Sequence, residues 1–195
     1  AGHRPEGGAP AVFVPRDSGA GEEAGWRESL AVIGRPTVLL GLLMTVLGFA
    51  GVFTVFTYIQ PILTGLAGFS QDSVSLILLV FGVGMIIGNL LGGRLADRGL
   101  APALLITLAA LAVVLGLFSF ALGHRWAAVA FVGLLGVASF ATVAPLQLWV
   151  LNRAQGAASL ASSFNIGAFN LGNALGAGLG GVVIERGGGF GAVPG

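Results

Sequence analysis

The chain has 195 residues, of which 55% are hydrophobic and only 9% are charged, and its formal net charge is +1. Soluble domains carry roughly 25% charged residues, so this composition excludes an ordinary water-soluble protein and predicts an all-α polytopic membrane protein. The sequence contains no cysteine, which excludes disulfides and thiolate metal sites, and its few arginines are too dispersed for a nucleic-acid-binding surface.

The first 34 residues differ in composition from the rest of the chain. Ala1 to Gly25 is rich in Gly, Pro, Ala and charged residues, which predicts a flexible linker in water. Trp26 to Leu30 combines a tryptophan with charged neighbours, which is typical of a short helix at a membrane surface. We expect residues 1–34 to form a linker with one short interfacial helix. Because no methionine starts the chain, we also expect it to be a fragment of a longer protein.

Five stretches of the remaining sequence contain no Asp, Glu, Lys, Arg or His. Each is long enough to supply the roughly 20 residues that a helix needs to cross a bilayer. We predict membrane-spanning helices near residues 37–63, 74–93, 101–122, 127–151 and 160–184. A soluble helical core would need polar faces, and the strands of a membrane β-barrel would alternate polar and apolar residues, so neither fold fits these stretches.

The distribution of arginine predicts the orientation of these helices. If the N-terminal linker is cytoplasmic, most arginines lie on the cytoplasmic side, and only Arg125 and Arg186 lie on the other. The cytoplasmic set is Arg4, Arg16, Arg27, Arg35, Arg94, Arg98 and Arg153. The positive-inside rule therefore predicts a multi-pass protein of the inner (plasma) membrane whose Ala1 end is cytoplasmic.

The chain also resembles itself at a shift of 84 positions. Residues 56–95 and 140–179 share ten ungapped identities, whereas about four are expected by chance at this composition. Both copies contain Gly-Asn-x-Leu-Gly, which begins at Gly88 and at Gly172. The copies are three spans apart, so equivalent helices cross the membrane in opposite directions and form an inverted repeat, as in many transporters. The third helix of the second repeat would lie near 185–206, so we expect it to be missing.

These features resemble a known family. Phe56 to Pro61, the sequence Gly-Arg-Leu-Ala-Asp-Arg-Gly at 93–99 and the segment from Ser159 to Asn173 resemble the C-terminal half of a major facilitator superfamily transporter. The resemblance is strongest to bacterial drug:proton antiporters of the arabinose and chloramphenicol efflux group. It implies that the spans are helices seven to eleven of twelve, in a six-helix bundle, and that Gly187 to Gly195 opens the turn toward a lost twelfth helix. It also implies a missing N-terminal half as partner.

The turn after the second span carries the superfamily pattern Gly-x-Leu-Ala-Asp-Arg. The resemblance implies that Gly93, Arg94, Asp97 and Arg98 form a conformational latch, in which Gly93 allows close helix approach and Asp97 pairs with an arginine or with helix amides. Gly99 follows Arg98 directly, and the basic residues that normally come next are absent. The alternative interpretation is that the arginines only anchor the topology and that Asp97 caps a helix.

Glycines recur at every fourth position in two spans. Gly84, Gly88 and Gly92 lie in the second span, and Gly172, Gly176 and Gly180 lie in the fifth. Such a stripe lets two helices pack closely in lipid, and the functional interpretation is that it also lets them slide during transport. Gly-x-Gly sequences in these spans are not nucleotide-binding loops, because no strand precedes them. We expect no cofactor and no metal.

Polar side chains within the spans are candidates for a substrate cavity, because polar groups are costly in hydrocarbon and face the bundle interior. The main candidates are Tyr58, Gln60, Asn89, Gln147, Asn165 and Asn173, and Asn170 is a further one. We expect Asn165 and Asn173 to share one face of the fifth span, opposite Tyr58 and Gln147. Interhelical hydrogen bonding without substrate contact is the alternative for each amide. The third span, which is poor in polar residues, is expected to be a peripheral support helix.

The charge pattern bears on mechanism. No Asp, Glu, Arg or His lies deep in any of the five spans, so a transported proton must be carried by another part of the protein. The sequence therefore predicts part of a secondary transporter that works by alternating access between bilayer faces, most simply as proton-coupled efflux of drugs, small sugars or metabolites. Uptake of a metabolite by the same fold is the alternative within transport. A membrane-embedded enzyme or a structural subunit is the alternative outside it.

Overall fold

The computed structural model describes residues 19–121 and 124–184, and throughout these ranges the chain is built of α-helices joined by short turns, without a strand. The helices are α1 (Gly19–Ile33), α2 (Pro36–Phe56), α3 (Ile59–Gly65), α4 (Gln71–Arg98), α5 (Leu100–Gly116), α6 (Phe118–Ala121), α7 (Arg125–Ala141), α8 (Val143–Arg153) and α9 (Ala158–Val183). The all-α prediction is confirmed. The expected linker up to residue 18 and the expected turn after Ile184 lie outside the described residues.

Within the part of the chain that the structure describes, four helical segments are long and apolar enough to cross a membrane: Pro36–Gly65, Gln71–Arg98, Arg125–Arg153 and Ala158–Val183. The third expected span is shorter, because α5 ends at Gly116 after 17 residues and the chain continues through Leu117 into α6. Large apolar side chains cover the outside of the bundle. Leu105 of α5 is 73% exposed and Phe120 of α6 is 79% exposed, which suits a surface in contact with lipid rather than water.

The structure corrects two details of the prediction. The helix around Trp26 is longer than expected, since α1 begins at Gly19, within the segment that we expected to be a flexible linker. The motif that begins at Gly93 does not form a turn, because α4 continues through it to Arg98 and only Gly99 separates α4 from α5. Leu95 and Ala96 favour helix, and the first helix-breaking residue after them is Gly99.

Two of the long segments are interrupted at equivalent places in the repeat. The segment Pro36–Gly65 breaks at Thr57 and Tyr58, and Arg125–Arg153 breaks at Thr142. Each break lies just before a proline, Pro61 or Pro145. Proline has no N–H to bond the carbonyl four residues earlier and its ring crowds that carbonyl, which explains both interruptions.

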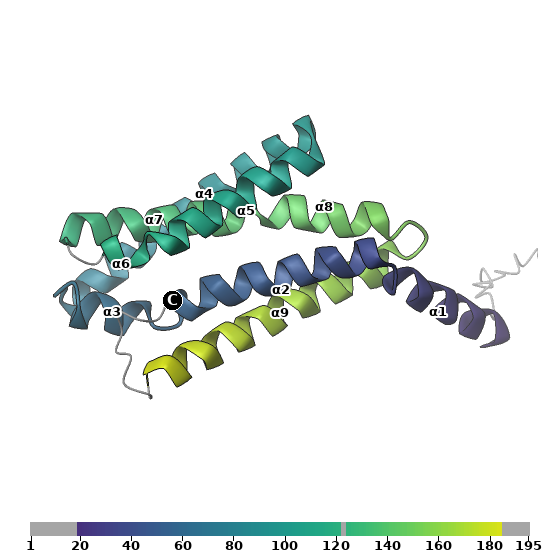
Figure 1. Cartoon of the computed structure of the whole chain (residues 1–195), viewed down its shortest axis with the longest axis horizontal. Helices are drawn as coiled ribbons and strands as arrows, with labels where there is room; N and C mark the ends of the chain where they lie inside the picture. The colour runs from purple at the N-terminus through teal and green to yellow at the C-terminus, as the bar shows by residue number, and fades with distance from the viewer. Residues whose placement is uncertain (1–18, 122–123, 185–195) are drawn as a thin grey trace, which may run out of the picture.

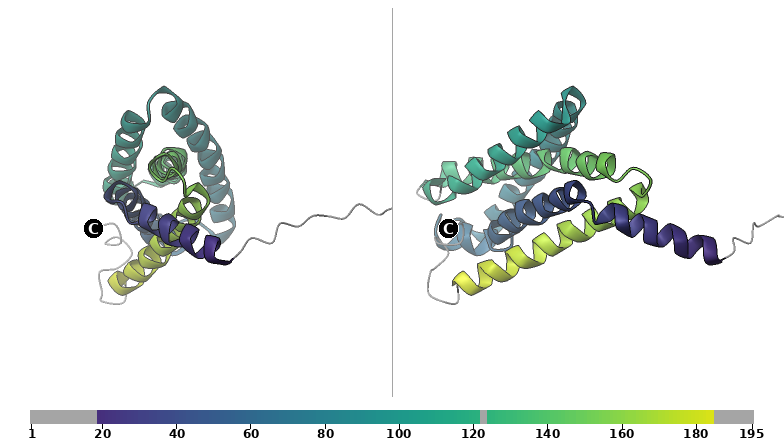
Figure 2. Two further views of the ribbon diagram at one scale, coloured as in Figure 1. Left: turned by 90° about the vertical axis from the view of Figure 1, so that its right-hand side faces the viewer. Right: turned by 45° about the vertical axis from the view of Figure 1, so that its right-hand side comes forward.

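Two helix pairs form the framework of the bundle: α4 with α7, and α2 with α9 (Figure 1). Figure 2 (left) shows α7 and α8 nearly end-on, with α4 and α5 on either side. Successive long helices alternate in direction, so α2 runs opposite to α7–α8, and α4 runs opposite to α9 (Figure 1). Exchange of the two repeats converts one of these pairs into the other, as expected for related units of opposite orientation.

All six glycines of the two stripes lie at the seams of these pairs. A Cβ atom on Gly88 would collide with the carbonyl oxygen of Val137 on α7, and one on Gly176 would collide with the carbonyl oxygen of Ala50 on α2. Such contacts bring one helix backbone against the other. Helices in lipid gain little from the hydrophobic effect when they associate, so this close approach supplies dispersion contacts that larger residues would prevent.

The two seams differ in register. Gly88 and Gly172 are 84 positions apart, but the carbonyls that they face, on Val137 and Val46, are 91 positions apart. The seven-residue difference is about two helical turns. The second helix of each repeat therefore packs at a different height along its partner, although the two pairs have the same architecture.

The seams give a test of stability with a matched control. Gly176→Ala is expected to destabilise the bundle by about 1–3 kcal/mol, because the new methyl group meets backbone atoms of α2. Gly178→Ala on the same helix has open space around its Cβ and is expected to be neutral, or more stable by up to about 1 kcal/mol. Denaturant titration of both variants in detergent measures the difference. Equal effects would contradict the close packing at Gly176.

Candidate functional site

A polar cluster lies between α2, α8 and α9, near the middle of the α2–α9 seam. The hydroxyl of Thr45 donates to Asn165 Oδ1 at 2.8 Å, and Asn165 Nδ2 donates to Gln147 Oε1 at 2.6 Å. Gln147 Nε2 in turn donates to the hydroxyl of Ser162 at 2.9 Å. The cluster thus joins three helices through side chains alone.

Burial makes these hydrogen bonds important for stability. Asn165 is 7% exposed and Thr45 is 2% exposed, so neither can exchange its partner for bulk water. A buried amide without partners costs several kcal/mol in an apolar environment, whereas a bonded one costs little. Close approach of α2 and α9 at Gly172 and Gly176, further along the seam, positions Thr45 within reach of Asn165.

The cluster borders a cavity of about 260 Å³. Six of the nine lining residues are apolar and the other three belong to the cluster; the lining consists of Thr45, Phe49, Phe140, Val143, Leu146, Gln147, Asn165, Ile166 and Phe169. The rings of Phe49 and Phe169 meet edge to face, with centroids 4.4 Å apart. An apolar cavity with a few convergent polar groups is the usual form of a small-molecule site.

The structure brings together only two of the expected cavity residues, Gln147 and Asn165. Tyr58 lies elsewhere along the seam, where its hydroxyl donates to the carbonyl oxygen of Ala177 at 2.9 Å and its ring packs against Gly180. The expectation that Tyr58 faces Asn165 across one path is therefore wrong. Its position just before α3, beside the glycine stripe of α9, explains the difference.

Four other candidates have different surroundings. Gln60 and Asn89 are exposed on the outside of the described bundle, and so is Asn170. Asn173 is partly buried, and its Oδ1 atom has no hydrogen-bond partner within the described residues. Asn173 lies two turns beyond Asn165 on α9 but is not part of the cavity lining.

Sequence reasoning missed Thr45 and Ser162. Both are small polar residues in apolar helices, where a hydroxyl usually bonds the carbonyl four residues earlier. Thr45 also makes that bond, to Gly41 at 3.1 Å, so its residue type alone did not indicate a role in the cluster. The spacing Ser162-x-x-Asn165, which puts both polar groups on one helix face, was the available signal.

Trp149 closes the seam between α2 and α8 on the α1 side of the cluster. Its indole N–H donates to the carbonyl oxygen of Thr37 at 3.1 Å, and the guanidinium of Arg153 lies 4.4 Å from the centre of its ring. Gly41 allows this contact, since a Cβ there would come within 2.8 Å of the indole.

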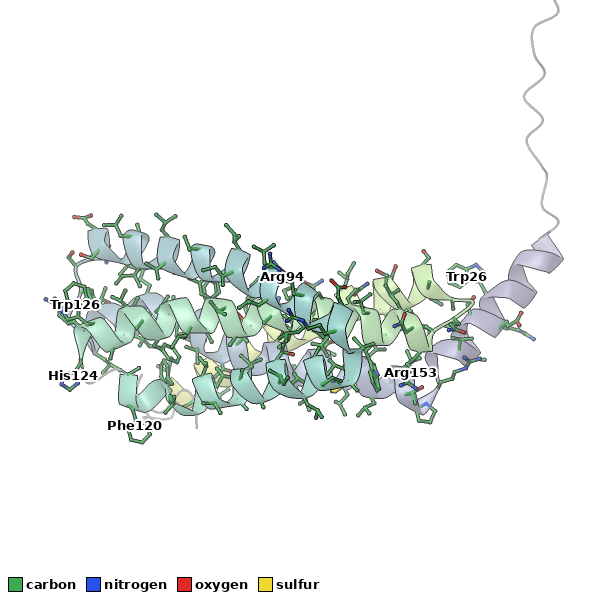
Figure 3. All side chains as sticks on the ribbon, turned by 90° about the horizontal axis from the view of Figure 1, so that it is seen from above. Trp26, Arg94, Phe120, His124, Trp126 and Arg153 are labelled. Atoms are coloured by element: carbon green, nitrogen blue, oxygen red, sulfur yellow. The ribbon has the colours of Figure 1, made fainter. Side chains whose placement is uncertain are left out.

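The residues expected to form a latch lie at the end of α4. Arg94, Asp97 and Arg98 are exposed in the described bundle, and Arg94 projects outward from it (Figure 3). Gly93 does not mediate a close helix approach here, because a Cβ on it would meet nothing within 4 Å. That part of the expectation is corrected for this bundle. The neighbouring Gly92 is the glycine at the seam, where it faces Ala141.

Titratable groups do not converge on the cavity. None of its nine lining residues is ionisable, and no group of three or more His, Cys, Asp or Glu side chains that could hold a metal occurs within residues 19–121 and 124–184. The walls of the cavity therefore offer amide and hydroxyl groups and apolar side chains, but no ionisable group.

The cluster gives a second test. Asn165→Leu is expected to destabilise the bundle by about 1–2 kcal/mol, because it leaves Gln147 Oε1 without its donor and removes one acceptor of the Thr45 hydroxyl, which keeps only the carbonyl oxygen of Gly41. Asn170→Leu, on the same helix but exposed, is expected to change the free energy of unfolding by less than about 0.5 kcal/mol. Unfolding in detergent, followed by circular dichroism, compares the two. A neutral Asn165→Leu variant would show that the cluster contributes nothing to stability.

Comparison with known proteins identifies the family. Residues 38–193 match the Major Facilitator Superfamily. The inner membrane transport protein YdhP of Escherichia coli K12 is 45% identical over 176 residues, which cover 90% of this chain and 45% of that protein. The MFS-type transporter YtbD of Bacillus subtilis is 35% identical over 89% of this chain and 45% of its own length. The purine ribonucleoside efflux pump NepI of Escherichia coli K12 is 31% identical over 82% of this chain and 40% of its own length.

The chain thus spans about half the length of the relatives that it matches. The predicted resemblance is confirmed, and the apolar helices together with these relatives indicate a multi-pass protein of the inner membrane. Relatives of this kind are transporters rather than enzymes. The chain, with its paired and glycine-seamed helices around a small apolar cavity, belongs to the Major Facilitator Superfamily of membrane transporters.

Proposed function

We propose that this chain is the C-terminal half of a secondary transporter that exports a small, uncharged solute, and that the cavity beside Asn165 is one wall of its substrate site. The observation that carries the proposal is the hydrogen-bonded cluster of Thr45, Gln147 and Asn165 at an otherwise apolar cavity. In a membrane protein such polar groups are expensive, and they characteristically face a solute path or a neighbouring helix.

The names of two relatives support transport across the inner membrane, and one of the two supports export. One is named a purine ribonucleoside efflux pump and another an inner membrane transport protein. A neutral, partly aromatic solute fits a cavity that has three phenylalanines and no ionisable group. Uptake of a metabolite remains the competing direction, since the fold alone does not determine direction.

The proposal includes a second half and an orientation. An alternating-access mechanism needs two bundles that rock about a shared site, so the partner of this bundle is the N-terminal half of the same protein. The α1 end is cytoplasmic in this proposal, in line with the arginine distribution. Arg94, Asp97 and Arg98 are exposed on α4 and would latch against that half in one transport state.

Export is tested by expression of the whole gene that encodes the chain in cells that lack it. Cells with the gene are expected to accumulate several-fold less of a labelled neutral purine nucleoside or aromatic drug than cells without it. Asn165→Leu is expected to abolish most of this difference, whereas Asn170→Leu, exposed on the same helix, retains it. Higher accumulation in expressing cells would instead establish uptake.

Proton coupling is tested separately. Because no lining residue is ionisable, the coupling carboxylate is proposed to lie in the other half of the transporter. Asp72→Asn and Asp97→Asn are therefore expected to leave the dependence of export on the proton gradient intact, although Asp97→Asn is also expected to slow export by weakening the latch. Export measured with and without a protonophore decides this. Export by either variant that no longer responds to the protonophore, in a normally folded protein, would contradict the assignment.

A further inference from the structure

The hydrogen bonds of the cluster all run in one direction. Thr45 donates to Asn165, Asn165 donates to Gln147, and Gln147 donates to Ser162. Each amide oxygen therefore already accepts one hydrogen bond, and each amide nitrogen has used one of its two N–H groups. The direction follows from the shorter contact of Thr45: its single hydroxyl proton has two acceptors in reach, Asn165 Oδ1 at 2.8 Å and the carbonyl oxygen of Gly41 at 3.1 Å. Donation to the nearer oxygen, that of Asn165, places the Nδ2 group of this amide on the side of Gln147.

This direction leaves the cluster with spare donors. The second N–H groups of Asn165 and Gln147 have no partner among the hydrogen bonds of the described residues. Both residues line the cavity. A buried N–H without a partner is rarer and more costly than a carbonyl that uses only one of its lone pairs. The polar part of this cavity wall therefore needs hydrogen-bond acceptors for its two free N–H groups more than it needs donors.

The rest of the cavity wall is largely aromatic, and the cavity itself is small. Phe49, Phe140 and Phe169 line the cavity with three aliphatic side chains, and the cavity volume is about 260 Å³. Drug-binding pockets usually measure about 300–1,000 Å³, so this wall accommodates one compact ring system. Aromatic faces and edges favour a flat, unsaturated ring over a ring of the same size that is covered with hydroxyls.

From these features we infer that the cavity selects flat, uncharged ring systems that present a carbonyl oxygen or ring nitrogen as hydrogen-bond acceptor, and that it discriminates against sugars. This inference rests on the proposed substrate site. The acceptor atom takes the free N–H groups of Gln147 and Asn165, and the ring lies against the phenylalanines. A sugar would bring several hydroxyl donors to a wall whose polar groups are already short of acceptors, and most of them would lose their water without replacement.

Binding to the purified chain in lipid nanodiscs tests this inference. The probes are quinoline, which has a ring-nitrogen acceptor; naphthalene, which has the same shape without polar atoms; indole, which has a donor only; and arabinose. Binding at pH 8, where quinoline is neutral, is measured by equilibrium dialysis and corrected with empty nanodiscs. Quinoline is expected to saturate a single site, indole to bind at least about fivefold more weakly, since one neutral hydrogen bond contributes about that factor, and arabinose not to bind.

Two variants test whether the preference for quinoline depends on the N–H groups of Gln147. Gln147→Met, which keeps the length of the side chain but removes both N–H groups, is expected to weaken quinoline about fivefold and to leave naphthalene unchanged. Asn170→Leu, the exposed control on α9, is expected to change neither. Circular dichroism establishes that each variant is folded, and the comparison of quinoline with indole in the unaltered chain does not depend on any variant.

Three results would overturn the inference: indole binding as tightly as quinoline, arabinose binding competitively with quinoline, or an equal loss of quinoline and naphthalene in Gln147→Met. Each leaves the proposed function standing if the whole transporter still exports a solute. Failure of export together with acceptor-selective binding would have the opposite meaning, since the cavity would recognise such rings without transporting them.

Discussion

The structure depends on backbone-to-backbone contact between helices that lipid does not push together. In water, burial of apolar side chains would drive α2 onto α9 and α4 onto α7, but in a bilayer the lipid chains solvate those side chains equally well. The remaining attraction between the helices comes from close packing of their backbones. This packing requires residues without a side chain at the positions where two helices touch. Gly176 and Gly88, which abut carbonyl oxygens of the facing helices, meet this requirement. The positions of the glycines therefore set which helices pair and at what height.

The polar site is a consequence of this packing. Once Gly172 and Gly176 bring α9 against α2, Asn165 is within 2.8 Å of the Thr45 hydroxyl, and α8 adds Gln147 beside them. The break at Thr142, caused by Pro145, separates α7 from α8, so α8 packs between the two seams as a short helix of its own. Thus the same two features that the sequence duplicates, glycine stripes and prolines after a break, determine where the polar cluster and its cavity form.

Much of the fold was predictable from sequence because it follows from the one-dimensional pattern of apolar residues, charges and glycines. The site was less predictable, because it depends on the rotation and height of helices relative to one another. Gln147 and Asn165 could be proposed as cavity residues because polar side chains are energetically unfavourable in lipid. The same argument applied to Tyr58 and Asn89, which lie elsewhere. Thr45 escaped notice because a threonine in a helix can satisfy its hydroxyl locally. The seven-residue difference between the seams is not visible in the ungapped repeat, so the partner of Asn165 could not be located by symmetry.

The second seam shows that the polar cluster is not required by the architecture. In the repeat, Phe81 of α4 is the residue that corresponds to Asn165 of α9. When the seven-residue shift between the seams is included, Gly136 of α7 corresponds to Thr45 of α2. A Cβ atom on Gly136 would collide with the backbone of Phe81. Phe81 is 7% exposed and packs against Phe56, with ring centroids 4.6 Å apart, in the largest apolar cluster of the bundle. The same junction is therefore stable when it is filled by an aromatic side chain. At the corresponding place in the α2–α9 seam, an amide leaves a cavity and spare hydrogen-bond donors. Packing alone favours neither a cavity nor an unpaired donor. This difference between two related seams is the strongest physical reason to assign recognition of a solute to Asn165.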